Sequence, residues 1–421
     1  MSGEDVVIVG GGLAGLCCAR SLREAGISFL LLDAADRVGG RVRTDIVEGF
    51  QLDRGFQALL LAYPEARRVL NYRALHLRPF YPGVLLRSMG RFHRLSDPRR
   101  RPLQALRSLH ARVATYGDKV HIGQLRRSAH RGSIEELLAR PETTTLELLH
   151  SYGFSEQVID RFFRPFVAEV FLDPDMVTSS RLFEFLLRMF SLDVAALPAA
   201  GMEAIPRQIA AALPVEAVRV EARVAAVDRS RVSLATGESI PARAVVVATD
   251  GVEAARLIEG LPPLTCRSVT CLYFAADESP IDEAIIALDG ESGAETAGPV
   301  NNLCVLTAVA PSYGPPGAAL ISATVLRGQE KDDAALEAAV REQLVGWFGA
   351  VVRSWRHLRT YRIPDAIPDQ RPPALTEERS RVAVRPGLYV CGDHRDTASI
   401  NGAMASGRRA AEAVIRELRG G

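Results

Sequence analysis

The sequence predicts an α/β protein with two interleaved domains, and three observations support this fold class. The first is a strand–turn–helix–strand pattern within Val6–Thr44, with glycines at the turn. The second is a strand, an acid and a glycine-containing helix near the other end, between Gly387 and Leu418. The third is length, because 421 residues exceed the usual size of one compact core. Together they predict a Rossmann-type dinucleotide-binding domain and a discontinuous α+β second domain.

The first unit of the chain begins with a β-branched run, Val6–Val9, which predicts a buried strand. An alanine- and leucine-rich segment, Leu13–Ala25, predicts a helix, and the apolar run Phe29–Leu32 predicts a second strand that ends at Asp33. The turn between strand and helix carries the GxGxxG spacing, on Gly10, Gly12 and Gly15. This is the dinucleotide-binding fingerprint in the structural context that it requires.

Each part of this fingerprint has a physical role. Gly10 allows a sharp turn off the strand, and Gly12 lets backbone approach a pyrophosphate because it has no Cβ. Gly15 lets the helix pack close to the strand, and the helix N-terminus offers unpaired N–H groups to an anion. Asp33 lies about 20 residues beyond the glycines, where an acceptor for ribose hydroxyls is expected.

A loop with two glycines between arginines follows, Arg37–Arg41. Its composition indicates backbone packed close to a charged ligand, and Arg41 is placed to form a bidentate contact with a pyrophosphate. A solvated basic loop is the alternative. The next segment, Phe50–Gln57, predicts a strand that ends in a tight glycine turn.

Composition limits the other functional classes. The net charge of +1 gives no support for nucleic-acid binding, and Lys119 and Lys331 are the only lysines, which leaves few candidates for lysine-based catalysis. The six cysteines form no CxxC pair and no zinc pattern with histidine, so no metal site is predicted. The sequence shows no secretory signal and no apolar run of about 18 residues, and we therefore expect a cytoplasmic protein.

Two motifs at opposite ends of the chain resemble those of the flavin-containing amine oxidoreductases. Asp33 followed by Arg37-Val38-Gly39-Gly40-Arg41 is similar to the GG-arginine motif of that superfamily, which includes monoamine and polyamine oxidases, protoporphyrinogen oxidase and phytoene desaturases. Gly392-Asp393 and the segment Ser399–Gly407 resemble most closely the ending of plant-type phytoene desaturases. The resemblance implies that the first unit binds the ADP half of a non-covalently held FAD.

The resemblance also assigns residues along the flavin. Gly55 and Phe56 match the turn beside the isoalloxazine ring, and Val224 matches a valine whose backbone pairs with adenine. Asp393 matches the contact to the ribityl chain, with a helix-capping acid as the alternative. The FAD site predicted from fingerprint and resemblance together comprises Gly10, Gly12, Gly15, Asp33, Arg37, Gly40, Arg41, Gly55, Phe56, Val224, Gly392, Asp393, Ile400 and Ala403.

The segment between these motifs begins with an expected helix, Tyr63–Leu75, and a basic stretch, Arg78–Arg131. We interpret the basic stretch as a solvated helical surface, with candidate helices at Leu103–Tyr116 and, just beyond it, Ser133–Leu138. The alternative is a surface that rests on anionic lipid and admits an apolar substrate, which would make the protein peripheral to the membrane.

Further helices are expected at Thr144–Tyr152, Glu156–Val167 and Ser180–Leu192; the last is apolar over more than half its circumference, as a core helix or a pocket wall would be. Strands of a second sheet are expected at Cys266–Ala276, Ala284–Leu288, Leu303–Ala310, Ala318–Leu326 and Trp355–Ile363. A helix that packs on this sheet is expected at Asp332–Phe348. We assign residues 1–75, 200–265 and 385–421 to the FAD-binding domain, and 76–199 and 266–384 to the substrate domain.

The resemblance implies hydride transfer to the flavin. The aromatic residue that amine oxidases of the family supply near the closing motif is Ser399 here, and neither lysine matches the flavin-side lysine. The leading hypothesis is therefore dehydrogenation or isomerisation of C–C bonds in a hydrophobic isoprenoid or polyene-like substrate. The alternatives are oxidation of an amine or a porphyrinogen with O₂, and a prenyl- or lipid-binding carrier like the Rab GDP-dissociation inhibitors.

His394 and Arg395 follow Asp393 directly. They are candidates for an acid/base pair or an anion partner in the reaction, and a solvent-facing loop is the alternative for His394. The electron acceptor, a quinone or O₂, is left open by the sequence.

Overall fold

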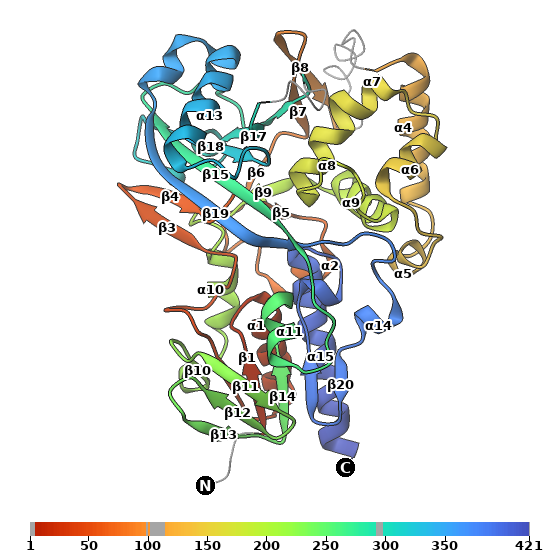
Figure 1. Ribbon diagram of the computed structural model, residues 1–421, viewed down its shortest axis with the longest axis vertical. Coiled ribbons are helices and arrows are strands. Elements are labelled where there is room, and N and C mark those ends of the chain that lie inside the picture. Colours follow the sequence, from red (N-terminus) through yellow and green to blue (C-terminus); the bar gives the residue numbers. More distant parts are fainter. Residues whose placement is uncertain (1–4, 98–99, 102–113, 292–297, 421) are drawn as a thin grey trace.

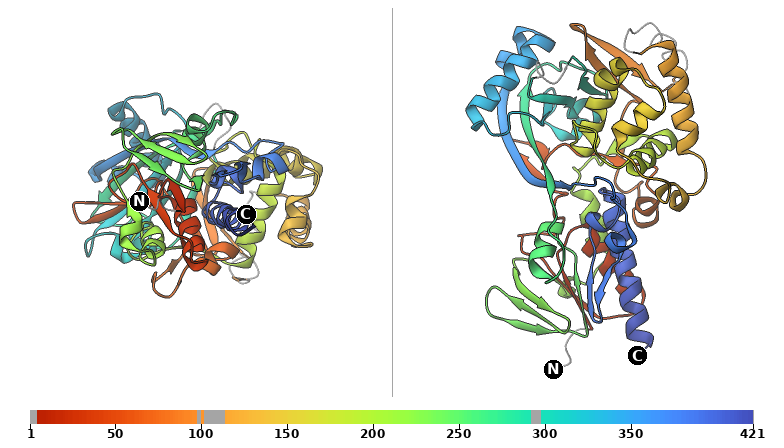
Figure 2. Two further views of the ribbon diagram at one scale, coloured as in Figure 1. Left: turned by 90° about the horizontal axis from the view of Figure 1, so that it is seen from below. Right: turned by 45° about the vertical axis from the view of Figure 1, so that its right-hand side comes forward.

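The computed structural model describes residues 5–97, 100–101, 114–291 and 298–420. These residues form two lobes joined at a narrower junction (Figures 1 and 2). One lobe contains the dinucleotide fingerprint and lies nearest both ends of the chain. The other contains a large sheet and a group of helices, and the long strands β15 (Cys266–Ala276) and β19 (Arg356–Pro368) run into it from the junction.

The first lobe is built on a six-stranded sheet with the order β10-β2-β1-β14-β21-β20. The first five strands are parallel, and β20 closes the edge in antiparallel orientation. In chain order the strands are β1 (Val6–Val9), β2 (Phe29–Leu32), β10 (Val218–Arg219), β14 (Ala244–Val247), β20 (Ala383–Arg385) and β21 (Leu388–Val390). Three separated parts of the chain therefore contribute to one sheet.

Both faces of this sheet are covered, as a parallel sheet requires. Helices α1 (Leu13–Glu24) and α15 (Ile400–Gly420) pack on the face that carries Val6 and Ile8. The other face packs against a small antiparallel sheet and a short helix. These elements are β11 (Val224–Asp228), β12 (Arg231–Leu234), β13 (Ser239–Pro241) and α11 (Gly251–Leu257).

Two glycines permit the close approach of the elements around α1. A Cβ on Gly15 would lie 1.9 Å from the carbonyl oxygen of Gly10, and a Cβ on Gly407 would lie 2.1 Å from that of Ala14. Helix α1 can therefore rest directly on the turn that follows β1, and α15 directly on α1. The two motifs that the sequence places at opposite ends of the chain are packed together by these contacts.

The second lobe contains a seven-stranded sheet with the order β19-β15-β18-β17-β16-β7-β8. Its neighbouring strands are antiparallel except for β16 and β7, which run parallel. The strands not yet given are β7 (Gly83–Ser88), β8 (Arg91–Ser96), β16 (Ile286–Asp289), β17 (Val300–Val305) and β18 (Ala319–Val325). Helix α13 (Asp333–Phe348) packs on one face and buries Leu336, Val340 and Leu344 against it.

The expected helical surface over Arg78–Arg131 is wrong in its first part, where β7 and β8 form a hairpin. Met89 and Gly90 at its tip both have positive φ, +53° and +73°, which fits the two-residue turns that join twisted strands. The helix expected over Leu103–Tyr116 falls, except for its last three residues, outside the described residues. Helix α4 begins only at Tyr116 and runs to Ala129, with a capping box between Thr115 and Asp118.

The helical layer opposite α13 contains α4, α5 (Ile134–Leu138), α6 (Thr145–Ser151) and α9 (Ser180–Leu192). The last three lie close to expected helices, whereas α4 was not expected. The single helix expected over Glu156–Val167 is instead three pieces: α7 (Glu156–Val158), the π-helical turn η1 (Ile159–Phe163) and α8 (Arg164–Phe171). Among the described residues, no helix combines the length and apolarity needed to cross a bilayer. Tyr116 and Val120 of α4 are exposed, and peripheral membrane contact stays a prediction.

Smaller elements connect the lobes. The expected strand Leu303–Ala310 ends early in a short helix, and the helix expected over Tyr63–Leu75 is confined to its first half. The connecting elements are β3 (Thr44–Val47), β4 (Phe50–Asp53), β5 (Leu59–Leu60), α2 (Pro64–Val69), β6 (Arg78–Pro79), β9 (Ala195–Leu197), α10 (Ala204–Ala210), η2 (Val215–Ala217), α12 (Leu306–Val309), η3 (Pro311–Tyr313), η4 (Ala350–Ser354), α14 (Glu377–Ser380) and η5 (Asp393–Arg395).

Candidate active site

A cavity of about 1320 Å³ extends from the six-stranded sheet into the second lobe. In the first lobe it is lined by the residues that follow the carboxyl ends of four parallel strands, namely Gly10, Asp33, Ala248 and Gly392. In the second lobe its walls come from η1, α8 and α9 on one side and from the seven-stranded sheet on the other. Because ligand pockets usually measure about 300–1000 Å³, this volume suits a large ligand or two ligands end to end.

The glycine turn forms the end wall of the cavity in the first lobe. Gly10 has a φ of +108°, which a side chain would strain, and nothing lies within 4 Å of where a Cβ on Gly12 would be. Helix α1 begins at Leu13 with no side-chain cap. Its first N–H groups and its positive dipole end therefore face space that an anion can enter.

Asp33 is fixed on the wall beside this turn. One carboxylate oxygen accepts a hydrogen bond from the N–H of Gly11 at 2.6 Å, and the other accepts from the N–H of Ala35 at 2.7 Å. Two backbone donors hold the carboxylate in one orientation at the cavity surface. Its remaining lone pairs suit the hydroxyls of a ribose.

Arg41 joins the two predicted motifs across the cavity. Its Nη2 lies 2.7 Å from Oδ1 of Asp393, and its Nη1 donates to the carbonyl oxygen of Ala366 at 2.9 Å. Both Arg41 and Asp393 line the cavity. The guanidinium is thus placed between the glycine turn and the end of β21, on the path that a pyrophosphate would take.

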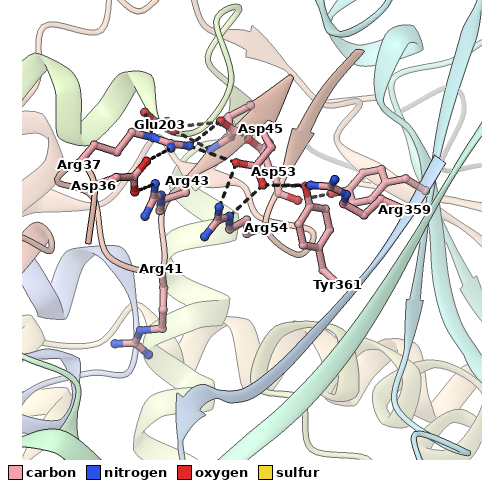
Figure 3. A network of polar contacts seen from close by, with 12 residues as sticks. Asp36, Arg37, Arg41, Arg43, Asp45, Asp53, Arg54, Glu203, Arg359 and Tyr361 are labelled. Carbon is pink, nitrogen blue, oxygen red and sulfur yellow. Dashed lines mark hydrogen bonds and ion pairs between the residues drawn. The ribbon is translucent and has the colours of Figure 1, made fainter. Parts of the chain in front are cut away.

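Arg37 has a different environment, although the sequence analysis grouped it with Arg41 at the cofactor. Its guanidinium contacts Glu203 at 3.0 Å, Asp36 at 2.9 Å and Asp45 at 3.1 Å, and it does not line the cavity. Figure 3 shows Arg37 turned into this polar network and Arg41 turned away from it. The structure gives Arg37 a role at the junction of the lobes and no support for a contact with the cofactor.

The same network contains two aspartates with opposite electrostatic environments. Burial raises the pKa of Asp53 to about 6, although Thr44, Tyr313 and the N–H of Met202 all donate to it. Asp45 is less buried, and hydrogen bonds from Arg54 and Tyr361 lower its pKa to about 2 against the effect of desolvation. These contacts connect β3 and β4 to α10 and to the seven-stranded sheet.

The predicted flavin-side turn also faces the cavity. Gly55 and Phe56 line it, and the Phe56 ring packs edge-to-face on Phe80 with centroids 6.2 Å apart. Tyr273 stabilises this turn, because its hydroxyl donates to the carbonyl oxygen of Asp53 at 2.7 Å. An aromatic wall is therefore in place where the two lobes meet.

The closing motif completes this region. Gly392, Asp393, Ile400 and Ala403 all line the cavity, and α15 starts at Ile400. Ser399 caps this helix by accepting a hydrogen bond from the N–H of Gly402 at 3.1 Å. The N-terminus of a 21-residue helix thus points its positive end toward the cavity.

Three more predicted residues have distinct placements. Val224 lines the cavity at the start of β11, and Gly40 lines it beside Gly12. Gly15 does not line it, and its contribution is the close packing of α1 described above.

The structure does not bring the two candidate catalytic residues to the cavity. Neither His394 nor Arg395 lines it, and both ring nitrogens of His394 are buried without a hydrogen-bond partner among the described residues. Burial lowers the pKa of His394 to about 4, so the ring is neutral at physiological pH. The imidazole packs beside Gly392 and Gly251, and a catalytic role for this residue has no geometric support.

Several cavity residues were missed by sequence reasoning. Tyr63 stacks on Phe185 at 6.3 Å and interacts with Ser399, which brings an aromatic ring next to the position where amine oxidases have one. Glu169 on α8 lines the second-lobe part of the cavity. The spacing of Phe162, Phe166 and Glu169 was visible in the sequence, but the π-helical turn that directs them was not.

The first-lobe residues fit an FAD molecule. Open space at Gly12, the uncapped start of α1 and the Arg41 guanidinium suit its pyrophosphate, and the fixed Asp33 carboxylate suits its ribose. Asp393 and the start of α15 lie where the ribityl chain and flavin would continue toward the second lobe.

Comparisons with known proteins agree with this geometry. Coproporphyrinogen III oxidase of Mycobacterium tuberculosis is 25% identical over 471 aligned positions that cover 99% of both chains. A carotenoid 3,4-desaturase of Haloarcula japonica is 46% identical, but only over 55 residues, or 13% of this chain and 11% of that protein. The crystal structure of cyclohexylamine oxidase from Brevibacterium oxydans has the same fold, with a TM-score of 0.77, 18% identity, and coverage of 99% of this chain and 100% of that one.

The family profile described as flavin containing amine oxidoreductase matches residues 13–415, which is nearly the whole chain. An FAD-dependent oxidoreductase activity follows from this match together with the cradle for the dinucleotide. The chain belongs to the flavin-containing amine oxidoreductase family.

Proposed function

We propose that this FAD enzyme dehydrogenates a large, predominantly apolar substrate of the isoprenoid or polyene type. The observation that carries the proposal is the composition of the cavity walls in the second lobe, which we call the chamber. Its helical wall is formed by apolar side chains of η1, α8 and α9, namely Phe162, Phe163, Phe166, Val170, Leu182, Phe185, Leu186 and Phe190. Its opposite wall includes Val84, Val269, Ile286 and Leu288 of the sheet.

These walls favour an apolar ligand on physical grounds. Burial of apolar surface contributes about 25 cal/mol per Å², so a long hydrocarbon skeleton gains affinity along the whole chamber. The rings of Phe162 and Phe166 are stacked 5.7 Å apart, and Phe190 packs on Phe166 at 5.7 Å, which fixes an aromatic surface. Water exclusion by these side chains also protects a hydride transfer from competing reactions.

The proposed reaction is a two-electron dehydrogenation, for which bound FAD supplies the hydride acceptor. Adjacent substrate carbons lose a hydride and a proton, and a carbon–carbon double bond forms between them. The proton passes to solvent, and a quinone or O₂ afterwards takes up the two electrons with two protons to form a quinol or H₂O₂. The contribution of the chain is to hold the substrate against the junction wall of Phe56 and Tyr63 and to keep water away.

Oxidation of a porphyrinogen is the second candidate, and two observations favour it. The full-length relative is named coproporphyrinogen III oxidase. Moreover, Arg100, Lys119 and Arg126 reach the cavity from α4 and from the segment after β8, and such cations would suit the carboxylates of a tetrapyrrole. Most of the side chains that line the chamber are nevertheless apolar, and we therefore place this candidate second.

Amine oxidation has less support from the site. Ser399 replaces the expected aromatic residue, and the one lysine that lines the cavity, Lys119, lies on α4, away from the flavin-side elements. A lipid-binding carrier does not agree with the family assignment or with the intact dinucleotide cradle.

The test is anaerobic incubation of the FAD-loaded protein with candidate substrates while flavin absorbance is followed. We expect polyenes or their partly saturated precursors to bleach the flavin, with the product one double bond richer by mass spectrometry. Bleaching by a porphyrinogen alone would establish the second candidate, and bleaching by amines alone would reject both.

A further inference from the structure

Glu169 is a polar side chain on the helical wall of the chamber, among mainly apolar neighbours. It lies on α8, three residues after Phe166 and next to Val170, both of which line the cavity with it. Its Oε2 is shielded from solvent and has no hydrogen-bond partner among the described residues, and no ion pair of that part of the chain includes it. A buried carboxyl oxygen without a partner is costly, and a ligand that completes its hydrogen bonding would explain its presence.

A second polar group faces the chamber from the sheet. Thr324 of β18 lines the cavity, and its hydroxyl accepts a hydrogen bond from Nδ2 of Asn302 at 3.1 Å. Asn302 is completely buried and also hydrogen-bonds to the Glu169 carboxyl. The side-chain Oδ1 of Asn302 accepts a hydrogen bond from Nδ2 of Asn301 at 3.2 Å, so the side-chain amide of Asn302 is already in use. Glu169 and Thr324 are thereby held as a pair that retains hydrogen-bonding capacity toward the chamber.

The protonation state of Glu169 follows from its surroundings. Desolvation raises its pKa to about 8, and the hydrogen bond from Asn302 only partly opposes this effect. At neutral pH the side chain is therefore a carboxylic acid with one O–H donor and free acceptor positions. A neutral acid recognises an uncharged oxygen function, whereas an ammonium group would require the acid to ionise.

We propose that Glu169 and Thr324 form a subsite for a hydroxyl or carbonyl oxygen, so that the preferred substrate is an oxygenated isoprenoid and not a pure hydrocarbon. The inference rests on the proposed function, because it concerns the substrate of the same chamber. Sites built to hydrogen-bond a substrate hydroxyl discriminate strongly against the analogue that lacks it, since their polar groups are then left unpaired. Glu169 is in this sense a specificity-determining residue and not an acid or base of the reaction.

The test compares geranylgeraniol with the hydrocarbon of the same skeleton, using the FAD-loaded protein. Dissociation constants are measured from the change in flavin absorbance on binding, without O₂. The wild type is expected to bind the alcohol at least about tenfold more tightly than the hydrocarbon. Glu169→Leu should remove this preference, Glu169→Gln should keep most of it, and Thr324→Val should reduce it.

Thr270→Val is the matched control, because Thr270 is an equally buried threonine of the same sheet, on β15, that does not line the cavity. Should Glu169→Leu fail to retain flavin, the Thr324→Val and Thr270→Val pair still decides the question. A preference that both threonine variants keep in full would overturn the proposal.

The remaining outcomes separate this inference from the proposed function. Equal binding of alcohol and hydrocarbon, with flavin bleaching by polyenes, would reject the oxygen subsite and leave the proposed function intact. Tighter binding of geranylgeranylamine than of the alcohol would show that the subsite takes a cation, and would also overturn the inference. Failure of all isoprenoids to bind would reject the proposed function itself.

Discussion

The two ends of the cavity are built from different parts of the polypeptide. At the FAD end, much of the wall is fixed by backbone: the glycine turn, the start of α1, and an aspartate whose oxygens are both held by N–H groups. At the chamber end, the walls are side chains from η1, α8, α9 and the sheet, and one carboxyl oxygen there has no partner. A backbone site tolerates almost no substitution, whereas a side-chain site can be changed residue by residue.

The largest expected effect comes from two alanine substitutions in the glycine turn. In Gly15→Ala the new Cβ would meet the carbonyl oxygen of Gly10 at 1.9 Å, so we expect a loss of stability of more than about 3 kcal/mol and little folded protein. In Gly12→Ala the Cβ enters open space, so the protein should fold normally but bind FAD poorly. Thermal unfolding and flavin content of the purified proteins measure the two effects separately.

Wild-type affinity of Gly12→Ala for FAD would contradict this assignment. That result would mean that the pyrophosphate does not approach Gly12 and that FAD binds elsewhere in the cavity.

The next largest effects are expected from leucine substitutions of Arg41 and Arg37, which should differ in whether they lower FAD affinity or stability. Arg41→Leu should weaken FAD binding by about tenfold or more, because a charge-assisted contact contributes about 1.5–3 kcal/mol. Arg37→Leu should leave FAD affinity within about threefold and lower stability by about 1–3 kcal/mol, because the buried carboxylate of Glu203 loses one partner. Equilibrium dialysis of FAD and chemical denaturation of both variants provide the measurements, and equal losses of FAD affinity would contradict the assignment.

A smaller effect concerns the chamber end and depends on pH. The pKa of Glu169 is raised from 4.5 to about 8 in the folded chain, so between these values the native state keeps a proton that the unfolded state has lost. Stability of the wild type therefore falls as pH rises through this window, and Glu169→Gln does not share this loss. We expect the melting temperature of the variant, relative to wild type, to rise by about 2 °C or more between pH 5 and pH 8.5.

A difference in melting temperature between Glu169→Gln and wild type that stays constant across this pH range would show that Glu169 ionises normally. The oxygen subsite would then contain a carboxylate, and preference for an amine would become the better expectation.

The smallest expected effect is that of His394→Gln. The imidazole is neutral, buried and off the cavity wall, so flavin reduction by substrate should change by less than about threefold. Stopped-flow measurement of flavin bleaching tests this. A loss of a hundredfold or more would restore the catalytic hypothesis and would require His394 to move toward the cavity.

The FAD end of the cavity could be predicted from the sequence much more fully than the chamber end. The spacing of Gly10, Gly12, Gly15 and Asp33, and of Gly392 and Asp393, reports backbone geometry, and all of these residues except Gly15 line one cavity in the structure. Arg37 and Arg41 look alike in sequence. The difference between them depends on Glu203, which is distant in the chain and contacts Arg37 but not Arg41.

The chamber could not be predicted in the same way. Glu169 is one of many helical glutamates, and only the packing of α8 against β16 and β17 leaves its carboxyl facing the chamber. The β7–β8 hairpin was missed because its basic residues mask the alternation of the strands, and its pairing with β16 joins segments separated by two hundred residues of sequence.

The contact between Gly407 and Ala14 has a consequence for the order of biosynthesis. On the ribosome, α1 emerges long before α15, and until then the face of α1 that receives Gly407 has no partner. During most of translation, the glycine turn and α1 therefore lack the packing that α15 later provides. Flavin capture is therefore expected only after α15 has been synthesised and packed on α1.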